Sequence, residues 1–95
     1  MRAALIVNPR SGGTNRKGLE LAGTLRDTDI DVTVLDRFDM LAPTLRRLAE
    51  AEAETLFISS GDGTVQEIQT RIAEDGMFAR FPALCLLPHG STNMT

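Results

Sequence analysis

Three short segments of the chain combine glycine with hydroxyl and amide side chains, a composition that suits phosphate binding. Residues 8–13 read Asn-Pro-Arg-Ser-Gly-Gly, residues 60–64 read Ser-Gly-Asp-Gly-Thr, and residues 88–93 read Pro-His-Gly-Ser-Thr-Asn. Glycine lets backbone N–H groups approach a phosphate closely, and a following helix adds its positive end. Arg10 adds a fork of N–H donors. A tight turn beside a solvated arginine is the structural alternative for the first segment.

The acidic residue of the second segment, Asp62, needs its own explanation. A carboxylate repels phosphate unless a metal ion, a proton or a hydrogen bond compensates its charge. Asp62 is therefore either a turn residue or a residue that handles Mg²⁺ or a proton. Thr64 and Glu67 have the spacing of a helix capping box, and that structural role is sufficient for both. His89 could serve as a base, but a single loop histidine is more often a surface residue.

Two familiar nucleotide-binding motifs are absent from the sequence. Gly13 and Gly18 have the spacing of Walker A glycines, but Leu19 follows where the motif needs lysine. The sequence also lacks Gly-x-Gly-x-x-Gly, the fingerprint of dinucleotide-binding folds. A phosphate site in this chain must therefore be of another type.

Short apolar runs that alternate with helical patterns predict how the polar segments are positioned. The runs cover residues 3–7, 31–35, 55–59 and 83–87, and a helix is expected from residue 16 to about residue 26. Apolar helix stripes are expected at Leu19, Ala22 and Leu25, at Leu41, Leu45 and Leu48, and at Val65, Ile68 and Ile72. Strands that alternate with helices predict an α/β fold, in which a parallel sheet lies within three αβα layers. The polar segments then follow the carboxyl ends of strands, where such sheets bind ligands.

Composition excludes several classes of protein. The 95 residues fit one small domain, and the single cysteine, Cys85, excludes an internal disulfide and is expected to be a small buried hydrophobe. The net charge of −3 and the lack of Trp and Tyr argue against a nucleic-acid partner. No apolar run reaches the ~18–20 residues that cross a bilayer, and the first run ends too early for a signal peptide. We therefore expect a cytoplasmic chain.

The three polar segments together resemble the motifs of the catalytic domain of the diacylglycerol kinase family, which includes bacterial lipid kinases and the sphingosine and ceramide kinases. Residues 8–12 match the family's Asn-Pro-x-Ser-Gly, and residues 88–93 match its Pro-x-Gly-Thr-x-Asn. Residues 60–64, followed by Glu67, match its Gly-Gly-Asp-Gly-Thr with a glutamate further on. The order and spacing agree, and the resemblance runs from about residue 5 to residue 93.

The resemblance implies an ATP-dependent lipid kinase of phospholipid metabolism, which transfers the γ-phosphoryl group of ATP to a lipid hydroxyl. It implies nucleotide contacts from Asn8, Pro9, Arg10, Ser11, Gly12, Ser60, Gly61, Gly63, Thr64, Gly90, Ser91, Thr92 and Asn93. Asp62 matches the family acid that is linked to Mg²⁺-ATP and, in some members, to activation of the acceptor hydroxyl. Asp62 is therefore the candidate catalytic residue and metal ligand. Such a site is chemically adequate, because phosphoryl transfer mostly needs positioning and charge neutralisation.

The chain departs from the family pattern in four places. Ser60 replaces a glycine, Ser91 replaces a threonine, and Met94 and Thr95 stand where many members have Asp-Phe. Family members also continue through the rest of this domain into a β-rich second domain that shapes the lipid cleft. We therefore expect residues 1–95 to be the truncated N-terminal part of a diacylglycerol/NAD-kinase-like ATP-binding domain, with little or no kinase activity alone. We also expect self-association of this part through exposed sheet edges, and transient membrane-surface contact by the full-length protein.

Two other interpretations stay open. A soluble small-molecule kinase of the NAD-kinase type shares the Gly-Asp-Gly loop, but the motifs at residues 8–12 and 88–93 favour the lipid kinases. The fold also permits a non-catalytic flavodoxin-like binding module, which would leave three aligned polar loops without a purpose. The lipid acceptor follows from the resemblance alone, since no basic amphipathic helix or lipidation signal marks membrane attachment.

Overall fold

The computed structural model describes residues 2–10, 15–76 and 78–87, apart from the side chains of Phe38 and Asp62. Its elements are β1 (Ala3–Val7), α1 (Arg16–Leu25), β2 (Asp31–Val34), the 3-10 helix η1 (Phe38–Met40), α2 (Leu41–Glu50), β3 (Thr55–Ser59), α3 (Asp62–Asp75) and β4 (Ala83–Leu87). The predicted strands are confirmed to within one residue at each end. No helix in this described part of the chain has the length and apolar character needed to span a membrane.

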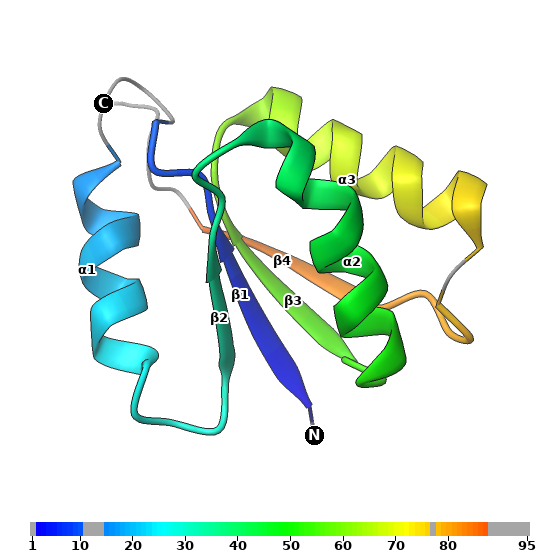
Figure 1. Cartoon of the computed structure of the whole chain (residues 1–95), viewed down its shortest axis with the longest axis horizontal. Helices are drawn as coiled ribbons and strands as arrows, with labels where there is room; N and C mark the ends of the chain where they lie inside the picture. The colour runs from blue at the N-terminus through cyan, green and yellow to red at the C-terminus, as the bar shows by residue number, and fades with distance from the viewer. Residues whose placement is uncertain (1, 11–14, 77, 88–95) are drawn as a thin grey trace.

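The strands form a parallel sheet in the order β2-β1-β3-β4, with α1 on one face and α2 and α3 on the other (Figure 1). This arrangement confirms the predicted three-layer αβα fold. Val7, the last residue of β1, pairs with Val34 of β2 and with Ser59 of β3, so the strands end in one row. The chain winds one way from β1 to β2 and then back across β1 to β3. The direction of winding therefore reverses between β1 and β3, which is where open α/β sheets bind ligands.

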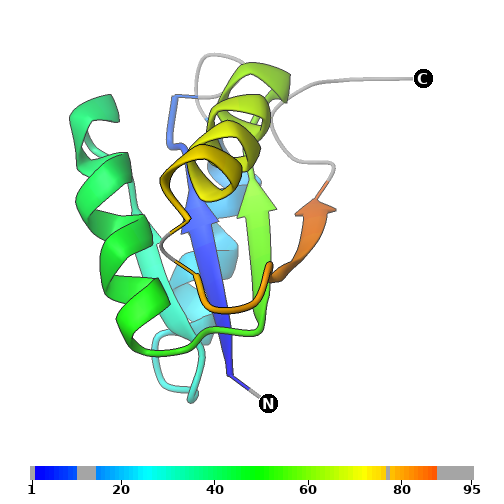
Figure 2. The same cartoon turned by 90° about the vertical axis from the view of Figure 1, so that its right-hand side faces the viewer.

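The core has two parts, one on each face of the sheet. Figure 2 shows the helices that cover the two faces. Leu5 and Val7 of β1 pack on the α1 side, while Ala4 and Ile6 pack on the side of α2 and α3. Burial on both faces explains why this strand reads as a continuous apolar run. Complete burial of each large aliphatic side chain contributes about 1.5–3 kcal/mol. The predicted stripe of α2, which consists of Leu41, Leu45 and Leu48, lies fully inside this core.

The predicted stripe of α1 is wrong at Leu19, which is 39% exposed. The helix instead buries Gly18 and Ala22, and Leu25 is partly buried on the same side. Gly18 lies so close to Asn15 and Ser59 that a side chain could not fit there. This close approach turns the face of Gly18 and Ala22 toward the sheet, and it leaves Leu19 at the margin.

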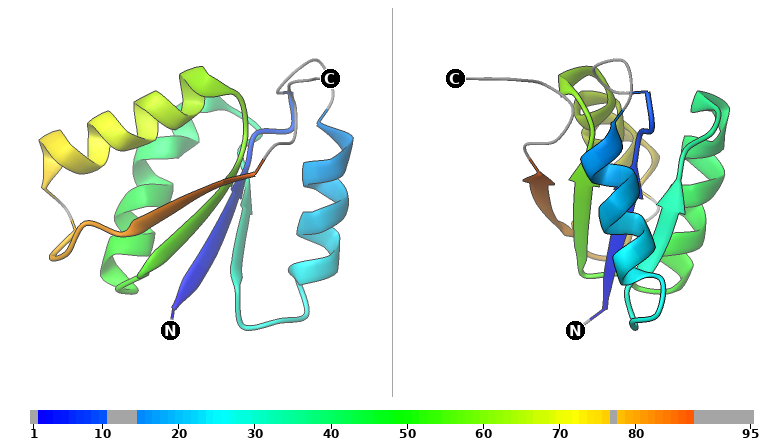
Figure 3. Two further views of the ribbon diagram at one scale, coloured as in Figure 1. Left: turned by 180° about the vertical axis from the view of Figure 1, so that it is seen from behind. Right: turned by 90° about the vertical axis from the view of Figure 1, so that its left-hand side faces the viewer.

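The expected burial of Cys85 is also wrong, because its side chain is exposed. β4 forms an edge of the sheet, and α1 packs against β1 and β2 rather than over β4 (Figure 3). Leu86 of the same strand is 51% exposed. An all-apolar strand therefore stands at an open edge in the described part of the chain.

The charged face of α2 is solvated, and Arg47 has a specific role there. Its guanidinium forms an ion pair with Asp31 and donates a hydrogen bond to the Thr33 hydroxyl at 2.6 Å. These contacts connect α2 to β2, the strand at the other edge of the sheet.

Candidate functional site

The turns that leave β1 and β3 lie side by side at the carboxyl edge of the sheet (Figure 1). The backbone N–H of Asn8, which follows β1, donates to the carbonyl of Ser59 at 3.0 Å. The Asn8 side-chain amide donates to the Thr64 hydroxyl at 3.2 Å. The structure therefore brings residues of the first and second predicted loops into direct contact, at the point where the winding reverses.

Several predicted contacts lie outside the described residues. These are Ser11, Gly12, Gly90, Ser91, Thr92 and Asn93, together with His89. The strand that leads to the third segment ends at Leu87, which pairs with Ser59. β4 therefore ends at the same edge as β1 and β3.

The start of α3 lies at this edge without a side-chain cap among the described residues. Gly61 caps the helix in an extended conformation (φ −83°, ψ 177°) and contributes no side chain to accept from the first N–H groups. The first N–H groups of an α-helix have no partner within the helix, and they form its positive end. Such a helix start favours the binding of anions, including phosphate.

The predicted capping box is wrong, because α3 begins at Asp62, two residues before Thr64. The extended conformation of Gly61 allows this earlier start. Thr64 lies within the first turn and uses its hydroxyl as the acceptor for Asn8. Glu67 forms an ion pair with Arg71 one turn further along the helix, at 2.7 Å. The hydroxyl of Thr64 therefore joins two loops instead of capping a helix.

The hydroxyl of Ser60 is buried at the junction between β3 and α3. Ser60 is only 8% exposed, and its Oγ finds no hydrogen-bond partner among the described residues. A buried hydroxyl without a partner costs about 1–3 kcal/mol. This unpaired group beside an open helix start is what a site for a polar ligand would contain.

Gly63 has no structural reason to be glycine in the part of the chain that the structure describes. It lies in the first turn of α3, is exposed, and has nothing within 4 Å of the position where a Cβ would stand. A glycine within a helix costs about 1 kcal/mol relative to alanine. Gly61 likewise has an ordinary φ of −83°. The backbone conformation therefore does not require a glycine at either position.

Arg10 lies beside a hollow at the ends of β1 and β2. Its backbone N–H donates to the Asn8 Oδ1 at 3.0 Å, which orders the turn, and its side chain is exposed. The hollow has a volume of about 190 Å³ and is lined by Asn8, Arg10, Leu35 and Asp36. The carbonyl of the preceding residue, Pro9, accepts from the N–H of Asn15 at 2.8 Å.

The carboxylate of Asp62 lies outside the described part of the structure, although its backbone begins α3. Within the described residues, no group of three His, Cys, Asp or Glu side chains could hold a metal ion. A Mg²⁺ ion that is bound with ATP needs only one or two carboxylates, because phosphate and water supply its other ligands. The position of Asp62 at the open helix start suits that kind of site.

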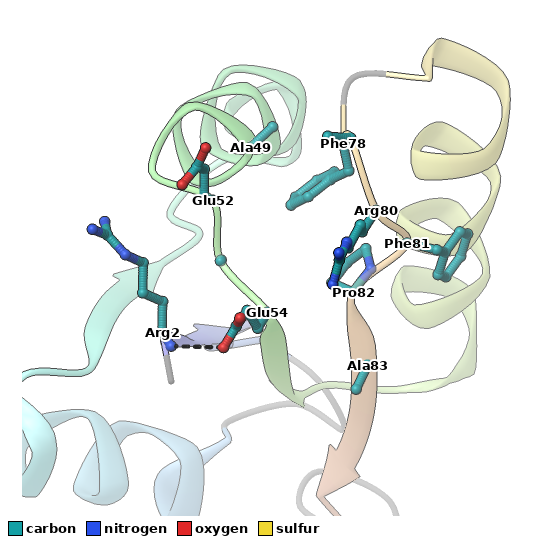
Figure 4. A pocket seen from close by; sticks show the side chains of 11 residues that line it. Arg2, Ala49, Glu52, Glu54, Phe78, Arg80, Phe81, Pro82 and Ala83 are labelled. Atoms are coloured by element: carbon teal, nitrogen blue, oxygen red, sulfur yellow. Dashed lines mark hydrogen bonds between the residues drawn. The ribbon is translucent and has the colours of Figure 1, made fainter.

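A larger hollow, of about 670 Å³, lies at the opposite edge of the sheet (Figure 4). Phe78 points into it, and the backbone N–H of Arg2 donates to a carboxylate oxygen of Glu54 at 3.3 Å on its wall. None of the predicted site residues lines this hollow. We place the candidate site at the carboxyl edge, because the start of α3 lies there beside the buried Ser60 hydroxyl, which has no partner among the described residues.

Comparison with known families identifies the family of the chain. The family model named diacylglycerol kinase catalytic domain matches residues 2–95. No match was found among curated proteins. The match covers every described element and both loops that meet at the carboxyl edge, and kinase activity is the general activity of the family. The chain therefore belongs to the diacylglycerol kinase catalytic-domain family.

Proposed function

We propose that the chain forms the ATP-binding part of a lipid kinase, which transfers the γ-phosphoryl group of ATP to a lipid hydroxyl. The observation that carries this proposal is the open start of α3 beside the buried, unpaired hydroxyl of Ser60. The family match supplies the reaction class. The lipid acceptor, Mg²⁺ and the cytoplasmic location with transient membrane-surface contact belong to the same proposal.

The residues at this edge have complementary roles toward a triphosphate. The backbone N–H groups of the first turn of α3 donate to phosphate oxygens, and the Ser60 hydroxyl gains the partner that it lacks. Arg10 adds a positive charge at the mouth of the neighbouring hollow. Mg²⁺, when bound, would neutralise charge on the phosphate oxygens. Asp62, at the first position of α3, would hold that ion or accept the proton of the acceptor hydroxyl.

The test is a calorimetric titration of the chain with ATP, carried out with and without Mg²⁺. We expect saturable binding that strengthens when Mg²⁺ is present. Asp62→Asn keeps the shape of the side chain and removes its charge, so it should abolish the Mg²⁺-dependent gain and leave the Mg²⁺-free affinity almost unchanged. An Asp62→Asn variant with the full Mg²⁺-dependent gain would assign Asp62 to the turn alone.

The same titration separates the competing interpretations. A flavodoxin-like module without kinase chemistry would show no preference for ATP over AMP, since it has no reason to bind a triphosphate. The acceptor is tested with the full-length protein, by supplying labelled ATP together with either diacylglycerol vesicles or soluble nucleotides. Label in the lipid fraction supports the lipid kinase, and label in a nucleotide acceptor that has been separated from ATP supports an enzyme of the NAD-kinase type.

A further inference from the structure

Asn15 is a buried polar residue beneath the candidate site, and no motif in the sequence marks it. It is 1% exposed and caps α1, with its Oδ1 accepting from the N–H of Gly18 at 3.0 Å. Its Nδ2 donates to the Asn8 carbonyl at 3.1 Å and to the Ser59 hydroxyl at 2.9 Å, and lies 3.2 Å from the Ser59 carbonyl. Both polar atoms of this carboxamide are therefore fully used.

These hydrogen bonds hold the segment that follows β1. Asn15 binds the carbonyl of Asn8 through its side chain and the carbonyl of Pro9 through its backbone N–H. Asn8 in turn donates to Thr64 in α3 and accepts from the N–H of Arg10. Asn15 is buried and cannot touch a ligand at the edge, so any effect on the ligand passes through Asn8, Pro9 and Arg10.

Gly18 makes this arrangement possible. A Cβ at position 18 would stand 2.5 Å from the Nδ2 of Asn15 and 2.5 Å from the Oγ of Ser59, which is closer than any real contact. A glycine is therefore needed at position 18, where the side-chain amide of Asn15 lies between α1 and β3. A glycine within a helix lowers helix stability by about 1 kcal/mol relative to alanine. Gly18 thus serves to accommodate Asn15, although its spacing from Gly13 imitates a phosphate-binding motif.

We infer that Asn15 is a positioning residue of the nucleotide site, which fixes residues 8–10 against the start of α3. The inference rests on the proposed function for its ligand and on the hydrogen bonds above for its mechanism. A side chain of the same shape without N–H donors should release the segment, and ATP should then bind a disordered edge more weakly.

Asn15→Asp is the sharpest test. The variant keeps an acceptor for the N–H of Gly18 but turns an oxygen toward the carbonyls of Asn8 and Ser59. Burial and these oxygens oppose the negative charge, so the pKa of the introduced carboxyl is raised. The destabilisation caused by the charge is absent below the unfolded pKa of about 3.9 and grows as pH rises toward the raised folded value. Relative to wild type at each pH, ATP affinity should fall about tenfold at pH 8, as expected for one or two lost hydrogen bonds, and recover toward pH 5.

Two further variants keep the test decisive. Asn15→Ser retains a helix cap but is too short to reach Asn8, so its affinity loss should not change with pH. Ile72→Ala destabilises the core at the far end of α3, where Ile72 is 3% exposed, without touching the edge. A positioning role predicts weak ATP binding in the Asn15 variants and near-normal binding by the folded fraction of Ile72→Ala. Wild-type affinity in Asn15→Asp at pH 8, or an equal loss in Ile72→Ala, would overturn the inference and leave the proposed function standing.

Amide hydrogen exchange supplies a readout that does not depend on ATP. If the wild-type chain binds no ATP, the proposed function fails, and exchange at the N–H groups of Asn8 and Asn15 decides the inference alone. Faster exchange at these amides in Asn15→Asp at pH 8, with unchanged exchange in α2, supports the positioning role for whatever ligand the edge binds. Unchanged exchange at both amides refutes it.

Discussion

The side-chain amide of Asn8 donates a hydrogen bond to the hydroxyl of Thr64 across 56 residues of sequence. This bond connects the segment after β1 to the first turn of α3, the two parts of the molecule that border the reversal in winding. Any ligand held by the start of α3 therefore meets a turn whose position depends on Asn8.

Replacing Thr64 with valine should weaken both the fold and the site. The substitution keeps the shape of the side chain and leaves the Asn8 amide without its acceptor, so we expect a loss of about 0.5–1.5 kcal/mol in the free energy of unfolding. ATP affinity should fall as well, because Asn8 loses its orientation. Urea denaturation and calorimetry measure the two effects, with the exposed Thr70→Val on the same helix as the control. Equal behaviour of the two variants would show that the bond does not order the site.

Removing the hydroxyl of Ser60 should have opposite effects on stability and on binding. Ser60→Ala deletes a buried group that lacks a partner among the described residues, so the ligand-free chain should gain up to about 1 kcal/mol of stability. ATP affinity should fall, because the ligand loses a hydrogen bond. Melting temperatures with and without ATP check this, since the ligand-induced increase should shrink in the variant. An unchanged increase would remove Ser60 from the site.

A methyl group at Gly63 should stabilise the helix and obstruct the ligand. Nothing in the described structure lies within 4 Å of the added Cβ, so Gly63→Ala should raise the free energy of unfolding by about 0.5–1 kcal/mol. We expect weaker ATP binding in the same variant, because the methyl group occupies space beside the proposed phosphate. Gly23→Ala, at an equally open position on α1, should match the stability gain and leave ATP affinity unchanged. Full ATP affinity in Gly63→Ala would contradict the proposed position of the phosphates.

The two glycines of α1 should respond to alanine with opposite signs. Gly18→Ala forces a methyl group against Asn15 and Ser59, and such overpacking costs about 1–3 kcal/mol. Gly23→Ala meets open space and should stabilise the chain by about 0.5–1 kcal/mol. Thermal or urea unfolding of both variants gives the comparison. A stabilised Gly18→Ala would mean that Asn15 is not confined as the structure shows.

The open edge at β4 should drive self-association of the chain, which sedimentation velocity can measure. β4 presents an apolar strand with Leu86 51% exposed, and unprotected strand edges pair with other chains. Leu86→Lys should shift the chain toward monomer, because a charge on an edge strand opposes pairing. Leu19→Lys alters an exposed leucine on a helix and should have little effect. A wild-type chain that sediments as a monomer at high concentration would refute this prediction.

The strands and their order of appearance could be predicted from the sequence because their signals are local. The runs at Ala3–Val7 and Thr55–Ser59 are continuous, apolar and bounded by turn residues, so even their ends were predicted correctly. The alternation of strands and helices also placed the polar loops at one edge, since parallel strands end on the same side. The stripe of α2 was predicted for the same reason, as its leucines repeat at helical spacing.

The sequence by itself thus determined the αβα layers and the family motifs that mark the candidate site. Only the tertiary structure decided that Thr64 joins two loops, that Asn15 holds one of them, and that Cys85 is exposed. The physical reason is the same in each case. The hydrogen-bond partners of Asn15 in β3 are 44 residues away, and the exposure of Cys85 depends on which strands α1 covers. Residue spacing indicates local periodicity. The hydrogen-bond partners of a buried amide and the exposure of an edge strand depend instead on elements that are distant in sequence.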